Sequence, residues 1–158
     1  MLNLFDIKQD LVNEMQTDGI SVSSNDILIE RIPPPHASLK FVEDHFAIYV
    51  FSLLSTDGTL TRSGRTLKVG SVQHGSAPRF YHHHYRPNSS NSNLAKSIIS
   101  NEWLWRCLSI KTLDANNVGQ WIKQNTLRDH LFIPRKFINL QFMIERYVRG
   151  RLGPVFEG

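Results

Sequence analysis

Hydrophobic and polar positions along the chain follow two periods, one typical of helices and one typical of strands. Residues 2–17 place apolar side chains three and four positions apart, which predicts an amphipathic helix that ends near Gly19. Residues 47–54 (AIYVFSLL) form an unbroken apolar, β-branched and aromatic run, as in a buried strand. A turn sequence at 56–59 follows, so 65–72 is expected to be its hairpin partner. The full set of predicted elements is helices at 2–17, 93–100, 117–125 and 137–149 and strands at 47–54, 65–72 and 130–133.

The order of these elements predicts the fold class. A hairpin, two helices, a third strand and a long helix indicate an α+β fold with a small three-stranded, mostly antiparallel sheet flanked by helices. The run Pro33-Pro34-Pro35 breaks regular structure and acts as a stiff spacer. We therefore expect residues 1–44 to be a helical N-terminal extension or linker, and residues 45–158 to form the main domain.

Composition narrows the class of protein. The chain has 158 residues, of which 41% are hydrophobic, enough for one domain with a buried core. It has no apolar run of about 18 residues and no secretory signal pattern, so we expect a cytoplasmic protein without a membrane span. The single cysteine, Cys107, excludes an internal disulfide framework and a cysteine-rich zinc site. The net charge of +4 suits an anionic partner, although many unrelated proteins share it.

The strand at 65–72 carries an unusual lysine. Alternation places Leu67 and Val69 on one face and Lys68 on the other, so Lys68 either lies on a solvated face or serves as a phosphate-binding or catalytic lysine. Tyr49 is equally open to two interpretations, packing or chemistry. Gly70 within a strand indicates a bulge or a close approach of the backbone to a ligand.

The polar segment after this strand offers further candidates. Arg79 presents a planar fork that suits a phosphate, although surface arginines are common. His82, His83 and His84 are consecutive, so they cannot converge from one strand or one helix face. At most one or two of them are expected to face a common site, where they would act as a general base or proton carrier. The alternative is that all three lie in a solvent-exposed loop.

The last predicted helix combines an acidic residue with basic ones. Glu145 either forms an i,i+4 ion pair with Arg149 or acts as a magnesium ligand, since magnesium often uses only one or two carboxylates. The basic residues near this helix either follow a phosphate backbone or form an ordinary solvated face. The candidate nucleic-acid contacts are Arg65, Lys96, Arg135, Lys136 and Arg149.

Taken in order, these motifs resemble those of the GIY-YIG nuclease superfamily. Ala47-Ile48-Tyr49 stands where that family has Gly-Ile-Tyr, and Lys68-Val69-Gly70 stands where it has Tyr-Ile-Gly. Arg79 follows Gly70 by nine residues, as the family arginine does. Glu145 lies in a late helix after a third strand, where the family places its metal-binding glutamate.

A bacterial stand-alone branch of that family is more similar still, and the resemblance covers about 45–158. The shared phrases include Arg79-Phe80, His84-Tyr85, Pro87-Asn88-Ser89, Leu94-Ala95-Lys96-Ser97 and 119–125 (GQWIKQN). Two departures stand out, because Ala47 replaces a glycine and Lys68 replaces the second tyrosine. Since that tyrosine is assigned a role beside the attacking water, the general base is left open among Tyr49, His83 and His84.

The resemblance implies hydrolysis of DNA phosphodiester bonds with a single divalent metal, Mg²⁺ or Mn²⁺. Glu145 would hold the metal and Arg79 would donate to the non-bridging phosphate oxygens. Tyr49, assisted by Lys68 or a histidine, would take a proton from the attacking water. A positive charge beside a phenol favours its ionised form.

Two other classes of function remain open at this level. One is a non-catalytic nucleic-acid-binding domain on the same scaffold. The other is a protein-interaction module that uses aromatic residues around Trp103 and Trp105, although core packing accounts for tryptophans more often. For the nuclease, a restriction, defence or mobile-element context is expected. A homodimer would allow both strands to be cut. Because the 158 residues hold no separate reader domain, we expect specificity to come from the N-terminal extension, the Asn/Ser patch, dimerisation or a partner protein.

Overall fold

The structure is a computed structural model that describes residues 4–38, 40–54, 63–73, 82–89, 92–107 and 112–156. Its elements, in chain order, are α1 (Leu4–Thr17), η1 (Ser24–Asp26), β1 (Leu28–Ile32), β2 (His45–Leu54), β3 (Ser63–Gln73), η2 (His83–Tyr85), α3 (Leu94–Ile99), α4 (Glu102–Cys107), α5 (Val118–Asn125), β4 (Thr126–Pro134), η3 (Arg135–Leu140) and α6 (Gln141–Leu152). The elements labelled η are short 3₁₀ helices.

The sheet has four antiparallel strands in the order β1-β4-β2-β3. The predicted α+β class is confirmed, but the predicted count of three strands is wrong. The additional strand, β1, comes from the segment expected to be an N-terminal extension and pairs with β4. Its sequence, LIERI, contains Glu30 and Arg31. These two charged residues interrupt the apolar run by which a buried strand is predicted.

An ion pair explains why polar residues occur in the inner strand. Nε and a terminal nitrogen of Arg31 donate to the two carboxylate oxygens of Asp129 at 2.8 and 2.9 Å. Asp129 and its neighbour Arg128 are both buried in β4. Burial of charge requires such pairing. The strand β4 therefore spans Thr126–Pro134. The apolar pattern predicted only its second half, residues 130–133.

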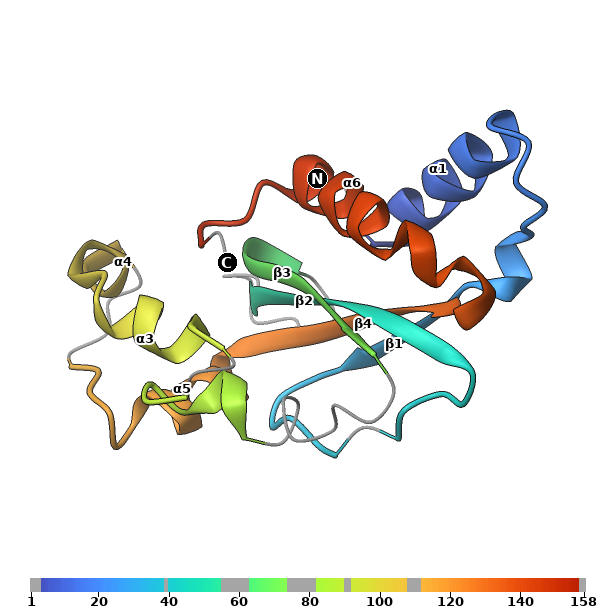
Figure 1. The fold of residues 1–158 in the computed structure, drawn as a ribbon. Helices are drawn as coiled ribbons and strands as arrows, with labels where there is room; N and C mark the ends of the chain where they lie inside the picture. Colours follow the sequence, from blue (N-terminus) through green and yellow to red (C-terminus); the bar gives the residue numbers. More distant parts are fainter. Residues whose placement is uncertain are drawn as a thin grey trace.

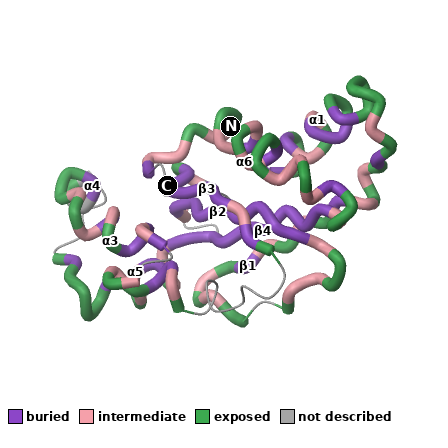
Figure 2. Tube along the Cα trace, viewed as in Figure 1, coloured by how far each residue is buried: buried purple, intermediate pink, exposed green. Residues whose placement is uncertain are grey.

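Helices cover the two faces of the sheet in separate groups (Figure 1). The helices α1 and α6 pack on the face that presents Ile48 and Val50 of β2. The elements η2, α3 and α5 pack on the opposite face, which presents Tyr49 and Phe51. Successive residues of β2 therefore enter two different cores, which is why the whole strand reads as apolar. Figure 2 shows the resulting buried band along β2 and β4.

The last predicted helix begins with a tighter turn than its periodicity indicates. A 3₁₀ segment, η3, precedes α6 and contains a kink at Phe137, where φ is −99° and ψ is 17°. The helix α6 ends at Leu152 and is followed by Gly153, whose φ of 52° is the left-handed conformation common after a helix C-terminus. Among the residues that the structure describes, no helix has the length and apolar character needed to cross a bilayer.

The strand β3 lies at the sheet edge and is irregular. Between the pairs Phe51↔Lys68 and Ser52↔Thr66 the register shifts by one residue, which leaves Leu67 as an extra position. Leu67 therefore joins the core on the Tyr49 face, while Val69 joins the other core. The expectation that Leu67 and Val69 share a face is wrong for this reason.

The segment before β2 is attached to the Tyr49 face by a chain of hydrogen bonds. Arg128 donates to the Tyr85 hydroxyl at 2.7 Å, and His36 Nδ1 lies 2.9 Å from the same hydroxyl. His36 Nε2 lies 2.7 Å from the Thr126 carbonyl oxygen, so Nε2 carries the proton and Nδ1 accepts from Tyr85. Burial lowers the pKa of His36 to about 4, which keeps this neutral tautomer at pH 7. Burial also raises the pKa of Tyr85.

Candidate active site

A pocket of about 440 Å³ lies where the edge strand β3 meets α6. Five residues singled out in the sequence line it, and they come from three different elements. These residues are Tyr49, Lys68, Gly70, Glu145 and Arg149. The pocket therefore brings together the two triplets and the helix glutamate, which are far apart in the sequence.

The Glu145 carboxylate accepts hydrogen bonds from two sides. The Ser71 hydroxyl donates to Oε2 at 2.5 Å, and the Arg149 guanidinium donates to Oε1 at 2.5 Å. The side chain of Glu145 is 14% exposed and that of Arg149 is 26% exposed, so the pair is only partly screened by water. The i,i+4 ion pair anticipated from the sequence is therefore present, and it lies inside the pocket.

Glutamines extend this polar network to the end of β3. Gln141 Nε2 donates to the Ser71 hydroxyl at 2.8 Å, and Gln73 Nε2 donates to Gln141 Oε1 at 3.0 Å. Ser71, Gln73 and Gln141 are not among the candidates that the sequence predicts. The spacing of Gln141, Glu145 and Arg149 at i, i+4 and i+8 places them on one face of α6, and that spacing was the available signal.

Lys68 is buried on the Tyr49 face, which excludes the solvated-face interpretation. It is 5% exposed and donates from Nζ to the Asn93 side-chain oxygen, just before α3. It pairs across the sheet with Phe51 of β2. A lysine held this way presents a localised positive charge at the pocket wall.

Gly70 is required because Tyr49 lies across it. The two residues are direct cross-strand partners, and a Cβ atom added at Gly70 would lie 2.3 Å from the Tyr49 hydroxyl oxygen and 2.5 Å from Cζ. The close approach at Gly70 is therefore to a side chain of the protein, which is neither the bulge nor the ligand contact predicted from the sequence. Tyr49 itself is 5% exposed, and its ring is fixed by this contact.

We expect Gly70→Ala to destabilise the protein by about 1–3 kcal/mol, because the new methyl group forces the buried Tyr49 ring out of its rotamer. Chemical denaturation monitored by circular dichroism measures the change. Gly150→Ala is the matched control, since a Cβ there meets nothing within 4 Å on the exposed side of α6. It should stabilise the protein by about 0.5–1 kcal/mol. Equal stability of wild type and Gly70→Ala would contradict the packing described.

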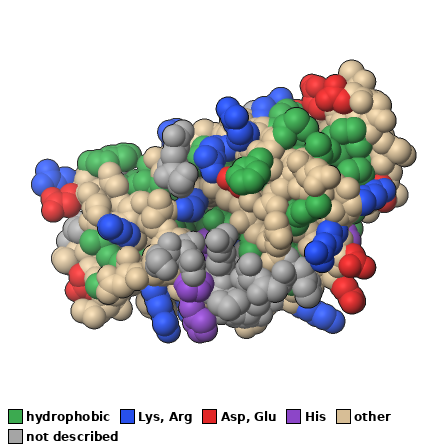
Figure 3. Space-filling model, in the orientation of Figure 1, with side chains coloured by type: hydrophobic (Ala, Val, Ile, Leu, Met, Phe, Trp, Pro, Cys, Tyr) green, Lys and Arg blue, Asp and Glu red, His purple; other side chains and the backbone are tan. Residues whose placement is uncertain are grey.

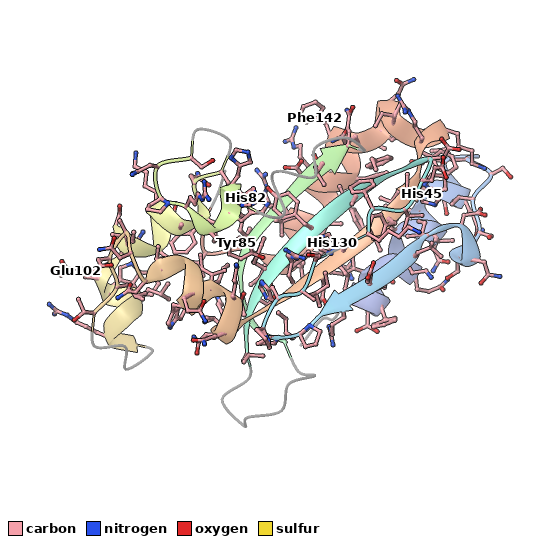
Figure 4. The ribbon with its side chains drawn as sticks, turned by 90° about the horizontal axis from the view of Figure 1, so that it is seen from below. His45, His82, Tyr85, Glu102, His130 and Phe142 are labelled. Carbon is pink, nitrogen blue, oxygen red and sulfur yellow. The ribbon has the colours of Figure 1, made fainter. Side chains whose placement is uncertain are left out.

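The structure separates the three histidines, as their adjacency in sequence requires. The His84 ring packs against Tyr49 with ring centroids 4.6 Å apart, and His84 Nδ1 lies 2.8 Å from the Ser92 hydroxyl. His83 Nδ1 instead lies 2.5 Å from the Ser89 hydroxyl. His82 is exposed beside η2 (Figure 4). His84 is thus the histidine that supports Tyr49.

A fourth histidine, which is not among the candidates predicted from the sequence, lies on the other side of Tyr49. His130 of β4 is the cross-strand partner of Tyr49 and is fully buried. Burial, with the nearby positive charge of Arg128, lowers its pKa well below the usual value. The row Gly70, Tyr49 and His130 across three strands therefore places a neutral imidazole behind the phenol.

The remaining candidates lie elsewhere or outside the described residues. Arg79 and the side chain of Trp105 fall outside the described part of the chain. Arg65 is exposed on β3, away from the pocket lining, and Lys96 lines a separate cavity of about 650 Å³ beside α3. The last two candidate residues, Arg135 and Lys136, lie at the start of η3. Arg135 lines a small hollow with Gln73, and Lys136 stacks over the Phe137 ring.

The pocket thus gathers a carboxylate, a phenol and two cations within one lining. The chain matches no model of a protein family, no curated protein and no solved structure. A function is therefore inferred from the chemistry of these residues.

A divalent metal ion is the cofactor that the sequence resemblance implies, and Glu145 is suited to hold it. A carboxylate offers about four lone-pair positions, and Ser71 and Arg149 occupy two of those of Glu145. Magnesium takes one or two protein carboxylates and completes its shell with water and phosphate oxygens. Among the described residues, no group of three or more His, Cys, Asp or Glu side chains forms a metal cage. The single carboxylate of Glu145 in this pocket therefore suits a magnesium ion whose coordination shell is completed mainly by water and by oxygen atoms of the substrate.

Proposed function

We propose that this chain is a metal-dependent endonuclease of the GIY-YIG type, which hydrolyses DNA phosphodiester bonds with one Mg²⁺ or Mn²⁺ ion. The observation that carries this proposal is the shared lining of one pocket by Glu145, Tyr49 and Lys68. A hard anionic ligand, a proton acceptor and a fixed cation are the groups that phosphodiester hydrolysis needs. The GIY-YIG resemblance of residues 45–158 adds support from the order of the motifs.

In this proposal each residue of the pocket has a separate role in hydrolysis. Glu145 holds the metal ion, which when bound supplies neutralising positive charge beside the scissile phosphate. The Tyr49 oxygen takes the proton of the attacking water as the new bond to phosphorus forms. The bond from phosphorus to the 3′ oxygen then breaks, and this oxygen takes a proton from solvent water, so the products carry a 5′ phosphate and a 3′ hydroxyl. Lys68, on the same face as Tyr49, favours the ionised form of the phenol.

Arginines are assigned to the phosphate oxygens. Arg149 lies at the pocket wall and is held by Glu145, so its guanidinium is oriented before substrate arrives. The GIY-YIG resemblance assigns the non-bridging oxygens to Arg79. Charge that accumulates there in the transition state is stabilised by preorganised donors.

One specific observation favours a second candidate, a nucleic-acid-binding domain without catalysis. The Arg149 guanidinium already neutralises Glu145, as it would in a purely structural ion pair. In that case the pocket and its cations bind phosphate, and Glu145 only positions Arg149. The two candidates differ in whether a divalent metal changes the covalent structure of DNA.

The test is incubation of the purified protein with supercoiled plasmid DNA in Mg²⁺, in Mn²⁺ and in EDTA. The proposed nuclease converts the plasmid to nicked or linear forms with either metal and leaves it intact in EDTA. Gel-shift assays of the EDTA samples report binding independently. Shifted but uncut plasmid in all three conditions would replace the first candidate with the second.

A further inference from the structure

Phe142 is the most exposed of the large hydrophobic side chains in the described chain. It is 80% exposed, in the first turn of α6, and Figure 4 shows it at the margin of the molecule beside the end of β3. Single exposed apolar residues are ordinary on protein surfaces, so exposure alone carries no functional meaning. Its place distinguishes Phe142, because it lines the same pocket as Glu145 and Tyr49.

Charged side chains border Phe142 along α6. Phe142, Glu145, Arg146 and Arg149 follow each other at i, i+3, i+4 and i+7, so they form one stripe of the helix. Arg146 is exposed, and Arg149 lines the pocket. In Figure 3 hydrophobic and basic side chains lie side by side over α6. Along this stripe, the Phe142 ring is followed by the candidate metal ligand Glu145. The guanidinium groups of Arg146 and Arg149 come after Glu145, toward the C-terminus of the helix.

Alternation of cations with an aromatic ring suits a polynucleotide. The cations meet phosphates, and the ring meets the flat face of a base, which every nucleotide has. The cores of interfaces between proteins are depleted in charged residues, so a stripe with three charged neighbours is poorly suited to a second copy of the chain. Bases within a duplex already stack on each other and leave no face open to a side chain.

We propose that Phe142 stacks on an unpaired nucleobase next to the scissile phosphate, so that the pocket takes single-stranded or locally unpaired DNA. This inference rests on the proposed function for the nature of the ligand. Phe142 is on this account a substrate-binding residue that sets the preference for unpaired nucleotides. The Arg146 and Arg149 contacts to phosphate act on single strands and duplexes alike.

The test compares binding of a fluorescently labelled 12-nucleotide DNA, as a single strand and paired with its complement, by anisotropy in EDTA. Phe142→Ala should weaken single-strand binding about tenfold and duplex binding less than about twofold. Met143→Ala is the matched control, since Met143 is 52% exposed in the same turn of α6 but does not line the pocket. It should leave both affinities within about twofold of wild type.

Phe142→Trp provides a second readout. It should keep the wild-type affinity, and its added tryptophan emission should be quenched by the single strand but not by the duplex. The wild-type chain, with its three tryptophans, supplies the background for subtraction. Salt titration separates stacking from charge, because Phe142→Ala should leave the salt dependence unchanged whereas Arg146→Ala should reduce its slope by about 1.

Several results would overturn the inference. Equal losses on single strands and duplexes, equal effects of Phe142→Ala and Met143→Ala, or an unquenched Phe142→Trp would each exclude stacking. A change of oligomeric state in Phe142→Ala by light scattering would instead assign this surface to contact between copies. Because EDTA prevents metal-dependent cleavage, a binding preference that depends on Phe142 stands even if wild type fails to cut plasmid, and only the proposed nuclease activity then fails.

Discussion

Glu145→Gln should reduce metal-dependent cleavage of DNA by at least about 10³-fold, which corresponds to the several kcal/mol that a bound metal supplies. Glutamine has the shape of glutamate, and its carbonyl oxygen can still accept the Ser71 hydroxyl hydrogen bond. It lacks the negative charge that would hold the ion. The substitution therefore removes metal binding with little disturbance of the contact between α6 and β3.

The loss is measured as the initial rate of supercoiled plasmid conversion, with thermal unfolding of the same samples as the check on folding. Glu102→Gln is the matched control, because Glu102 and Arg106 form the same i,i+4 arrangement on α4, largely exposed to solvent and 4.0 Å apart. That control should cleave at the wild-type rate. A Glu145→Gln protein that is folded and cuts at more than a tenth of the wild-type rate would end the case for Glu145 as the metal ligand.

The hydrophobic pattern predicts the strands whose burial is apolar and misses those whose burial depends on charge. The hairpin of β2 and β3 follows from the run at 47–54 and from the turn predicted at 56–59, which lies outside the described residues. The strand β1 and the first half of β4 do not, because Arg31 and Asp129 satisfy each other inside the sheet. A hydropathy pattern counts both residues as surface, since the pairing partner is 98 positions away.

The residues of the pocket were more predictable than the contacts that orient them. Tyr49, Lys68 and Glu145 are recognised from the order of three short motifs, and all three line one pocket. The bulge at Leu67 is not visible in the sequence, and alternation consequently assigns Leu67 to the wrong face. Choosing His84 over His83 as the neighbour of Tyr49 likewise needs the three-dimensional structure, since both follow the same motif.

Tyr49→Phe should lower the cleavage rate by about 10²–10⁴-fold, the range that a positioned general base contributes. The ring keeps its packing over Gly70 and against His84, so only the hydroxyl group is lost. The expected loss therefore falls on the rate at saturating DNA, while DNA affinity in EDTA stays within about twofold of wild type, since an interaction that acts in the transition state leaves ground-state binding unchanged.

Tyr147→Phe is the control for this substitution. Tyr147 lies on α6 outside the pocket lining, against Arg151, and burial raises its pKa. Its hydroxyl has no part in the proposed chemistry, so the variant should cleave at the wild-type rate. If Tyr49→Phe retains more than a tenth of the activity while His84→Gln loses it, the proton acceptor is His84 and Tyr49 only positions that ring. Loss in both variants, with DNA binding intact, is the result expected if Tyr49 is the base and His84 supports its ring, because His84 is fully buried and does not line the pocket.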